Sequence, residues 1–219
     1  MGDIPALYRE YERVTGTSID RRVVCYYTFA FLQLAVIGAT FFMMPEIRGW
    51  NWIEGMLEKA SITRRAYEAV AELHGLDLDH NLTLPDPTPD SLEASGLRKL
   101  IADIGRLPTS GAFADWERDL LGAIPDFLLN YTRYRSWFET VSRTDIEVLL
   151  GKSFDDLAAA DAAVQARIDT DDPADDNELV RLMHRRMLRL SMITAGTNPD
   201  ETNPFFYILA PVIDRERDE

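Results

Sequence analysis

The sequence has only one cysteine, Cys25, among its 219 residues. A single thiol cannot form an internal disulfide framework or a metal site built from several cysteines, and this usage is typical of a reducing compartment. Because Cys25 lies within an apolar segment, we predict a small buried side chain rather than a nucleophile. We therefore expect a cytoplasmic protein without disulfides.

Positive charge is scarce as well. Lys and Arg total 23 against 37 Asp and Glu, which gives a formal net charge of -14 at pH 7. Residues 1–75 carry 9 acids and 8 bases, whereas residues 76–219 carry 28 acids and 15 bases. An acidic field repels phosphate backbones, so we expect no nucleic-acid partner.

Two motifs of phosphate and acyl chemistry are missing. The sequence has no Gly-x-Ser-x-Gly elbow, which α/β hydrolases use to expose their nucleophile. Residues 151–153 read Gly-Lys-Ser, but Ile146 occupies the position of the glycine that opens a phosphate-binding loop. We predict no phosphate loop here.

The segment around His80 contains an incomplete kinase-like spacing. His74, Asp77 and Asn81 approach the pattern of a kinase catalytic loop, but the aspartate comes one position too late. Asp77, Asp79 and His80 can hold a divalent cation only loosely if this segment has no fixed geometry. We therefore predict no catalytic residue, no cofactor and no metal site.

The most prominent feature that the chain does contain is an uncharged segment at residues 23–44, which includes fourteen large apolar side chains. Leaving each of them in water costs roughly 1.5 to 3 kcal/mol, so the segment needs burial in a protein core, a bilayer or a partner. Its length suits a bilayer, and Arg21 and Arg22 can flank it on the cytoplasmic side. Residues 1–22 are charged and amphipathic, so we expect no secretory leader. Gln33 is its one strongly polar side chain and needs a hydrogen-bond partner or a ligand.

Helical periodicity dominates the chain, and we predict an all-α fold with a three-helix unit at residues 1–75. Gly16 can end a first short helix, Asp20 can cap the long apolar helix, and Gly75 can end a third helix over residues 52–74. Residues 76–91 contain three prolines and four aspartates, which predicts an irregular linker.

Residues 92–219 are predicted to form an acidic bundle of about five helices with an apolar tail over residues 205–213. We expect the helices to cover residues 91–107, 113–122, 125–151, 153–168 and 177–194. Pro125 suits a first helical turn, and Ser153 with Asp156 resembles a capping box.

Two side-chain rows in this bundle have more than one interpretation. An aromatic seam is expected to be core, with a stacking surface as the alternative; it consists of Phe127, Tyr131, Tyr134, Phe138 and Val141. On the last helix, apolar side chains are expected to be buried, namely Leu179, Met183, Met187 and Leu190. The arginines on its other side are expected to pair with carboxylates, with anion binding as the alternative; they are Arg181, Arg185, Arg186 and Arg189.

Three stretches of the first unit carry a family resemblance. They read YERVTGTSID at residues 11–20, YYTFAFLQLAVI at residues 26–37 and ITRRAYEAVAELHG at residues 62–75. This pattern resembles the C-terminal end of the aminoglycoside-phosphotransferase-like family of small-molecule kinases. The resemblance implies that these helices form the back of a kinase's larger lobe, with the apolar segment in a protein core. The nucleotide-binding sheet and catalytic aspartates of that family lie upstream of such a segment.

A second, fainter pattern appears in the bundle. LAAADAAVQARI at residues 157–168, LVRLMHRRMLRL at residues 179–190 and Asn198-Pro199 resemble a helical domain of unknown function that occurs beside these kinases. The resemblances together imply a non-catalytic portion or accessory protein of such a kinase. The partner, or a second copy, would cover residues 23–44, and Gln33, Trp50 and Trp52 would line a substrate pocket. The alternative is a membrane-associated protein whose residues 23–44 span the bilayer.

Overall fold

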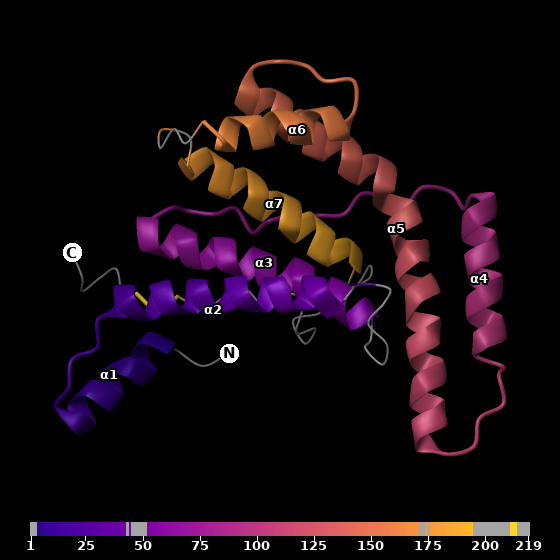
Figure 1. Ribbon diagram of the computed structural model, residues 1–219, viewed down its shortest axis with the longest axis horizontal. Coiled ribbons are helices and arrows are strands. Elements are labelled where there is room, and N and C mark those ends of the chain that lie inside the picture. Colours follow the sequence, from indigo (N-terminus) through magenta and orange to yellow (C-terminus); the bar gives the residue numbers. More distant parts are fainter. Residues whose placement is uncertain are drawn as a thin grey trace.

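The computed structural model describes residues 4–42, 44, 52–170, 174, 176–194 and 211–213. Within these residues every regular element is a helix, which confirms the all-α prediction. Seven helices follow one another (Figure 1): α1 Ile4–Thr15, α2 Arg21–Phe42, α3 Trp52–His74, α4 Leu92–Ile104, α5 Ala112–Leu150, α6 Leu157–Ile168 and α7 Asp176–Thr194.

Several predicted helix ends are confirmed, and each lies at a capping residue. Asp20 Oδ1 accepts hydrogen bonds from the backbone N–H groups at the start of α2, and Ser91 Oγ does the same for α4. Gly16, Gly75 and Gly151 directly follow α1, α3 and α5 with φ of 69°, 65° and 64°. Only glycine adopts this left-handed conformation without a steric penalty, so each of them ends its helix.

The prediction of two helices over residues 113–122 and 125–151 is wrong, because α5 runs through Pro125 as one helix of 39 residues. Proline removes one backbone donor from such a helix, while the other hydrogen bonds of the long helix remain. α4 packs along α5 (Figure 1), so neighbouring contacts also favour the continuous form.

The start of α6 also differs from the prediction. Asp156 itself is the N-cap, and its side chain accepts a hydrogen bond of 2.8 Å from the N–H of Ala159. Ser153 is exposed and lies before the helix, so it does not form the expected capping box. An aspartate side chain satisfies the first free N–H groups as well as a serine does.

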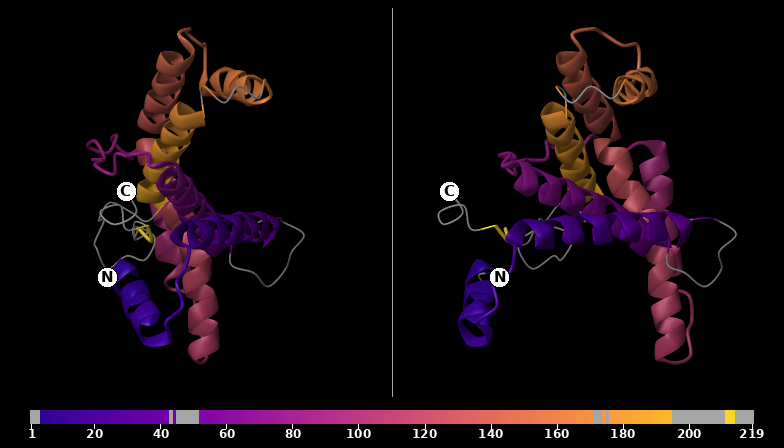
Figure 2. Two further views of the ribbon diagram at one scale, coloured as in Figure 1. Left: turned by 90° about the vertical axis from the view of Figure 1, so that its left-hand side faces the viewer. Right: turned by 60° about the vertical axis from the view of Figure 1, so that its left-hand side comes forward.

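α2 and α3 form an antiparallel pair that lies side by side in both views of Figure 2. The Arg22 guanidinium donates to the carbonyl of Leu73 at 3.1 Å, and the Cys25 thiol donates to the carbonyl of Ala69 at 3.2 Å. α1 stands to one side (Figure 2) and has no buried residue.

α3 occupies the middle of the molecule, since α2 packs on one side of it and α7 on another. Four of its alanines are almost completely buried, namely Ala60, Ala66, Ala69 and Ala71. Small side chains let helices approach closely, so this composition suits a helix that is covered by two neighbours.

The bundle core forms where α5, α6 and α7 meet. Tyr134 and Phe138 pack with Ile193, and Phe127 is buried as well, so these three residues of the aromatic seam are core as predicted. Tyr131 and Val141 are half-buried. On α7 the apolar side chains predicted to be buried are only half-buried, and the apolar side chains that are fully buried are Leu182, Leu188, Met192 and Ile193. The reason is that α7 is covered by both α3 and α5, which places its most buried positions between the two contact faces.

Residues 76–91 have no regular structure up to Ser91, as predicted, but they run against the helices. Thr88 donates from its backbone N–H and its hydroxyl to the carbonyl of Arg133, and Leu84 packs on the Tyr134 cluster. Arg181 of α7 donates to the carbonyl of Asp77. The segment therefore has a fixed path across α5 and α7.

Candidate functional site

Of the three residues predicted to line a pocket, only Gln33 has a described side chain. Gln33 is half-buried on α2. Trp50 lies outside the described residues, and Trp52 begins α3 with a side chain that is likewise outside the description. Their pocket role stays a prediction.

One face of α2 carries large apolar side chains that this chain leaves in water. We call it the α2 face; its eight residues are Val23, Tyr26, Tyr27, Phe31, Leu34, Ile37, Phe41 and Met44. Phe31 and Leu34 at its centre are 71% and 69% exposed. Seven of them lie on α2, where steps of three and four residues, with Tyr26 next to Tyr27, place them along one side of the helix, opposite the contact with α3. Met44 follows the end of the helix. The family resemblance implies that the whole apolar segment lies in a protein core. Within the described residues, only the side of α2 that contacts α3 is covered.

α2 also has the length of a membrane span. Among the described residues, Arg21–Phe41 is the one helical stretch long and apolar enough to cross a bilayer, with a mean hydropathy of 1.7. However, α3 lies along it and carries Arg64 and Glu68 near its middle. Charged side chains at bilayer depth are costly, which weighs against a spanning orientation of this hairpin.

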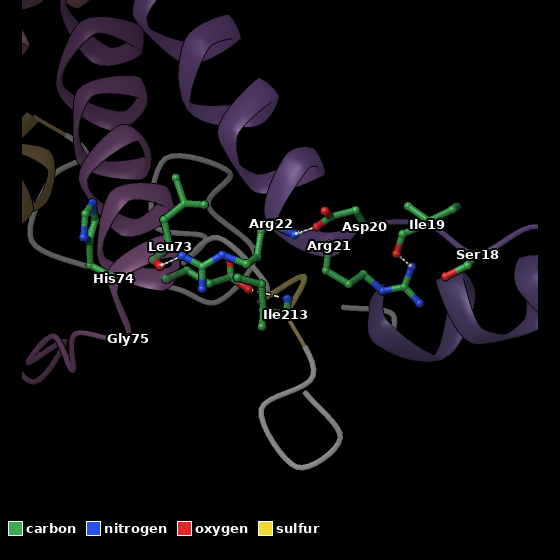
Figure 3. Close-up of a pocket in the computed structure, with 10 residues that line it drawn as sticks. Ser18, Ile19, Asp20, Arg21, Arg22, Leu73, His74, Gly75 and Ile213 are labelled. Atoms are coloured by element: carbon green, nitrogen blue, oxygen red, sulfur yellow. Dashed lines mark hydrogen bonds between the residues drawn. The ribbon is translucent and has the colours of Figure 1, made fainter. Parts of the chain in front are cut away.

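A cavity of about 900 Å³ lies between residues 18–20, the start of α2, the end of α3 and Ile213 (Figure 3). Its polar side chains are already engaged: Arg22 donates to Leu73, Arg21 pairs with Glu12, and Asp20 caps α2. This arrangement stabilises the helix ends and leaves few polar groups for a ligand.

The end of the apolar tail lies against the same cavity. Val212 is buried, and the N–H groups of Val212 and Ile213 both donate to Oε1 of Glu72 on α3. Residues 211–213 therefore pack back onto the first unit, whereas residues 205–210 of the predicted tail lie outside the described residues.

The arginines of α7 pair with carboxylates, as predicted. Arg186 makes two contacts with Asp161 of α6, and Nη1 of Arg189 lies 2.6 Å from Asp145 Oδ2 of α5. Arg185 reaches the same Asp145 oxygen at 3.6 Å. These ion pairs hold α7 to α5 and α6. The arginine charges are thus paired with carboxylates of the same chain, as in the first of the two interpretations of this row.

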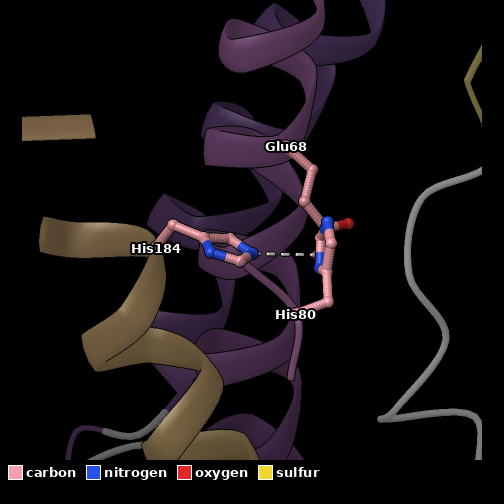
Figure 4. A group of neighbouring side chains, drawn as sticks. All are labelled: Glu68, His80 and His184. Carbon is pink, nitrogen blue, oxygen red and sulfur yellow. Dashed lines mark ion pairs between the residues drawn. The ribbon is translucent and has the colours of Figure 1, made fainter. Parts of the chain in front are cut away.

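A cluster of three polar side chains lies inside the molecule, and it was not predicted from the sequence. Glu68 of α3, His80 of residues 76–91 and His184 of α7 point toward one another (Figure 4). One ligand atom from each lies within 4.8 Å of the others. His184 Nε2 is 3.5 Å from Glu68 Oε1, and the two imidazole rings meet edge to face with centroids 4.9 Å apart.

This cluster is shielded from solvent. His184 is 0% exposed and Glu68 is 6% exposed, while His80 is half-buried. Burial lowers the pKa of His80, and the neighbouring His184 and Arg64 lower it further, against the opposite effect of Glu68 and Asp79. His80 is therefore a neutral imidazole with a free lone pair at neutral pH.

Arg64 completes the surroundings of the cluster. It is 0% exposed, and its Nε lies 3.3 Å from Glu68 Oε1. Burial lowers the pKa of the Arg64 guanidinium, and the Glu68 charge opposes this shift. Arg64 and Glu68 therefore form a buried ion pair beside the two histidines.

The cluster was missed because its members lie far apart in sequence, and because residues 76–91 were expected to be a flexible linker. One signal was present: Glu68 lies among the alanines of residues 66–71, where a lone charge is unexpected in a closely packed helix.

No family model, no curated protein and no solved structure matches this chain. The resemblance to aminoglycoside-phosphotransferase-like kinases therefore stays a prediction from the sequence.

Proposed function

We propose that this chain is a helical, non-catalytic accessory protein of an aminoglycoside-phosphotransferase-like kinase, and that the α2 face binds the larger lobe of that kinase. The observation that carries this proposal is the exposure of eight large apolar side chains, seven on one side of α2 and Met44 just beyond its end. A continuous apolar surface of this kind marks an interaction site in soluble proteins.

The energetics favour a protein partner with an apolar groove. Covering each side chain of the α2 face contributes roughly 1.5 to 3 kcal/mol before the costs of association. The residues recur at three- and four-residue steps, which is the pattern of helices that bind in grooves. The face carries no charge, so the matching surface on the kinase is expected to be apolar too.

The position of the resemblance supports the same surface. Residues 11–20, 26–37 and 62–75 fall on α1, α2 and the end of α3, and residues 26–37 include most of the α2 face. α1 adds apolar side chains that are also exposed, namely Leu7, Tyr11 and Val14. The part of the chain that resembles a kinase lobe is thus the part with uncovered apolar surface.

The test is a binding experiment with a double variant, Phe31→Ser with Leu34→Ser. The binding partner tested is an aminoglycoside-phosphotransferase-like kinase, and complex formation is followed by gel filtration with light scattering. We expect a complex with the unaltered chain and a clear loss of it with the double variant. Val148→Ser is the matched control, because Val148 is 78% exposed on α5, away from the α2 face.

A hydrophobic dye gives a second readout of the surface. We expect dye fluorescence with the unaltered chain and with V148S, and weaker fluorescence with the double variant. A stable monomer that binds neither the dye nor the kinase would contradict the proposal. Self-association that is lost in the double variant would identify a second copy as the occupant instead.

A second candidate is membrane association through α2, favoured by the length and mean hydropathy of Arg21–Phe41. In this case the chain stays with the lipid fraction during carbonate extraction, because a spanning helix cannot leave the bilayer. Release into the soluble fraction would exclude this candidate and leave the kinase proposal as it stands.

A further inference from the structure

Three segments that are distant in sequence converge on one small volume inside the molecule. α3 contributes Glu68, the irregular segment contributes His80, and α7 contributes His184 (Figure 4). Because all three positions are fixed by packing, their side chains are held together without a ligand. Two imidazoles and one carboxylate form a set that binds first-row transition metals.

The distances suit such an ion. In a tetrahedral zinc site with bonds of about 2.0 to 2.2 Å, neighbouring ligand atoms lie about 3.3 to 3.6 Å apart. Glu68 Oε1 and His184 Nε2 are 3.5 Å apart, which already matches this spacing. All three ligand atoms lie within 4.8 Å of one another, so a small movement of the half-buried His80 completes the geometry.

The hydrogen bonding of His184 points to a ligand as well. The side chain is 0% exposed, yet neither Nδ1 nor Nε2 has a hydrogen-bond partner. Nδ1 of His80 is also buried without one. Buried polar atoms in native proteins are nearly always satisfied. A neutral imidazole has one nitrogen with a free lone pair, so one nitrogen of each histidine is available to bind a cation.

We propose that Glu68, His80 and His184 bind a divalent transition-metal ion, with zinc preferred, and that this ion clamps α3, residues 76–91 and α7 together. Three protein ligands leave a fourth position for a water molecule. Because the cluster is largely enclosed, the ion acts on stability: it adds a direct link among three segments that otherwise meet through packing and a few polar contacts, such as that of Arg181 with the carbonyl of Asp77. This role is independent of partner binding at the α2 face.

Arg64 sets the expected strength of the site. Its guanidinium lies 3.3 Å from the Glu68 oxygen that would face the ion. The positive charge repels a cation, so we expect weaker binding than in a site with the same ligands and no nearby arginine. The same contact holds the Glu68 side chain in place, as partners of ligating carboxylates do.

The experiment measures zinc binding to the full chain after treatment with a chelator and removal of any affinity tag. We expect one equivalent of zinc by calorimetry and elemental analysis, and a higher melting temperature with zinc present. Cobalt substituted for zinc gives visible absorption bands that report imidazole and carboxylate coordination.

Three single variants make the result specific. His80→Gln and Glu68→Gln each remove one ligand with little change in volume, and we expect at least a tenfold loss of affinity and no rise in melting temperature with zinc. His74→Gln is the matched control, because His74 is the one histidine of the sequence outside the cluster and is exposed at the end of α3. It should bind zinc as the unaltered chain does.

Circular dichroism establishes that each variant is folded before zinc is added. His80 is half-buried, so H80Q keeps the test decisive even where substitution of the fully buried His184 would unfold the chain. Failure of the unaltered chain to bind zinc or cobalt, or binding that persists in both H80Q and E68Q, would overturn the proposal. Loss of binding in H74Q would overturn it as well.

Discussion

Cys25 shows how the α2–α3 contact sets the chemistry of a single residue. Its thiol donates to the carbonyl of Ala69 at 3.2 Å and lies 3.6 Å from Glu72 Oε2. Burial raises the pKa of Cys25 to about 12, and the charge of Glu72 adds to the effect. The thiol therefore stays protonated at neutral pH and cannot act as a nucleophile there.

We predict that Cys25 reacts slowly with a thiol reagent in the native protein and quickly after unfolding in urea. The reason is that the reagent needs an accessible thiolate, and the folded structure denies both access and ionisation. The rate of colour release from a disulfide reagent at pH 8 measures this. Equal rates in native and unfolded protein would show that the α2–α3 contact is not as described.

The same pKa shift has a consequence for stability. An unfolded thiol loses its proton near the ordinary value of 9.0, whereas the folded one keeps it to about 12. Between these values the folded state binds more protons than the unfolded state, so the contribution of Cys25 to the free energy of unfolding falls as the pH rises. Below pH 9 this contribution is constant.

For single residues, the sequence predicted the burial of Cys25 but not the cluster of Glu68, His80 and His184. An apolar neighbourhood is visible in the local sequence, and it was enough to predict a buried thiol. The meeting of Glu68, His80 and His184 depends on how α3 and α7 pack, which no local pattern contains. His80 was considered for a cation, but with Asp77 and Asp79 as its neighbours instead of Glu68 and His184.

The helices illustrate which signals act over a few residues. Gly16, Gly75 and Gly151 end helices because the chain needs a left-handed φ at those positions, and this requirement is local. The continuity of α5 through Pro125 and the outward orientation of the α2 face are set by neighbouring helices. The sequence therefore predicted helix ends better than it predicted which faces are covered.

A pair of glycine substitutions tests this view of the elements. Gly151→Ala is expected to destabilise the protein by about 1 kcal/mol, because φ at Gly151 is 64° and alanine is strained there. Gly96→Ala, inside α4, is expected to stabilise it by about 0.5 to 1 kcal/mol through helix propensity. At both positions a methyl group would meet no atom within 4 Å, so crowding does not enter.

Urea denaturation followed by circular dichroism measures both changes. Opposite signs for the two variants are the expected result. A stabilising G151A would mean that α5 does not end in a left-handed turn at this glycine.

The whole molecule is organised around α3, which is shared by the two halves of the chain. α2 packs on it from the first half and α7 from the second, and residues 76–91 cross between α5 and α7. The arrangement in Figure 1 places α3 between α2 and α7. Loss of α7 would therefore uncover the buried alanines of α3, which couples the stability of the two halves.

We predict that both halves unfold in a single transition, measured with one probe in each. Cys25 labelling reports α2 and α3, and in a variant with Trp50→Phe and Trp52→Phe the remaining tryptophans, Trp116 and Trp137, report α5. The two probes should give the same urea midpoint, because α3 belongs to both contact sets.

Arg189→Ala sharpens this test, since it acts only on the second half. It removes the contact of Arg189 with Asp145 and should lower the free energy of unfolding by roughly 1 to 3 kcal/mol, between the values for exposed and buried ion pairs. In a coupled molecule the midpoint seen by Cys25 falls together with the tryptophan midpoint. A shift confined to the tryptophans would show that the first half folds on its own and that α3 transmits no stability from α7.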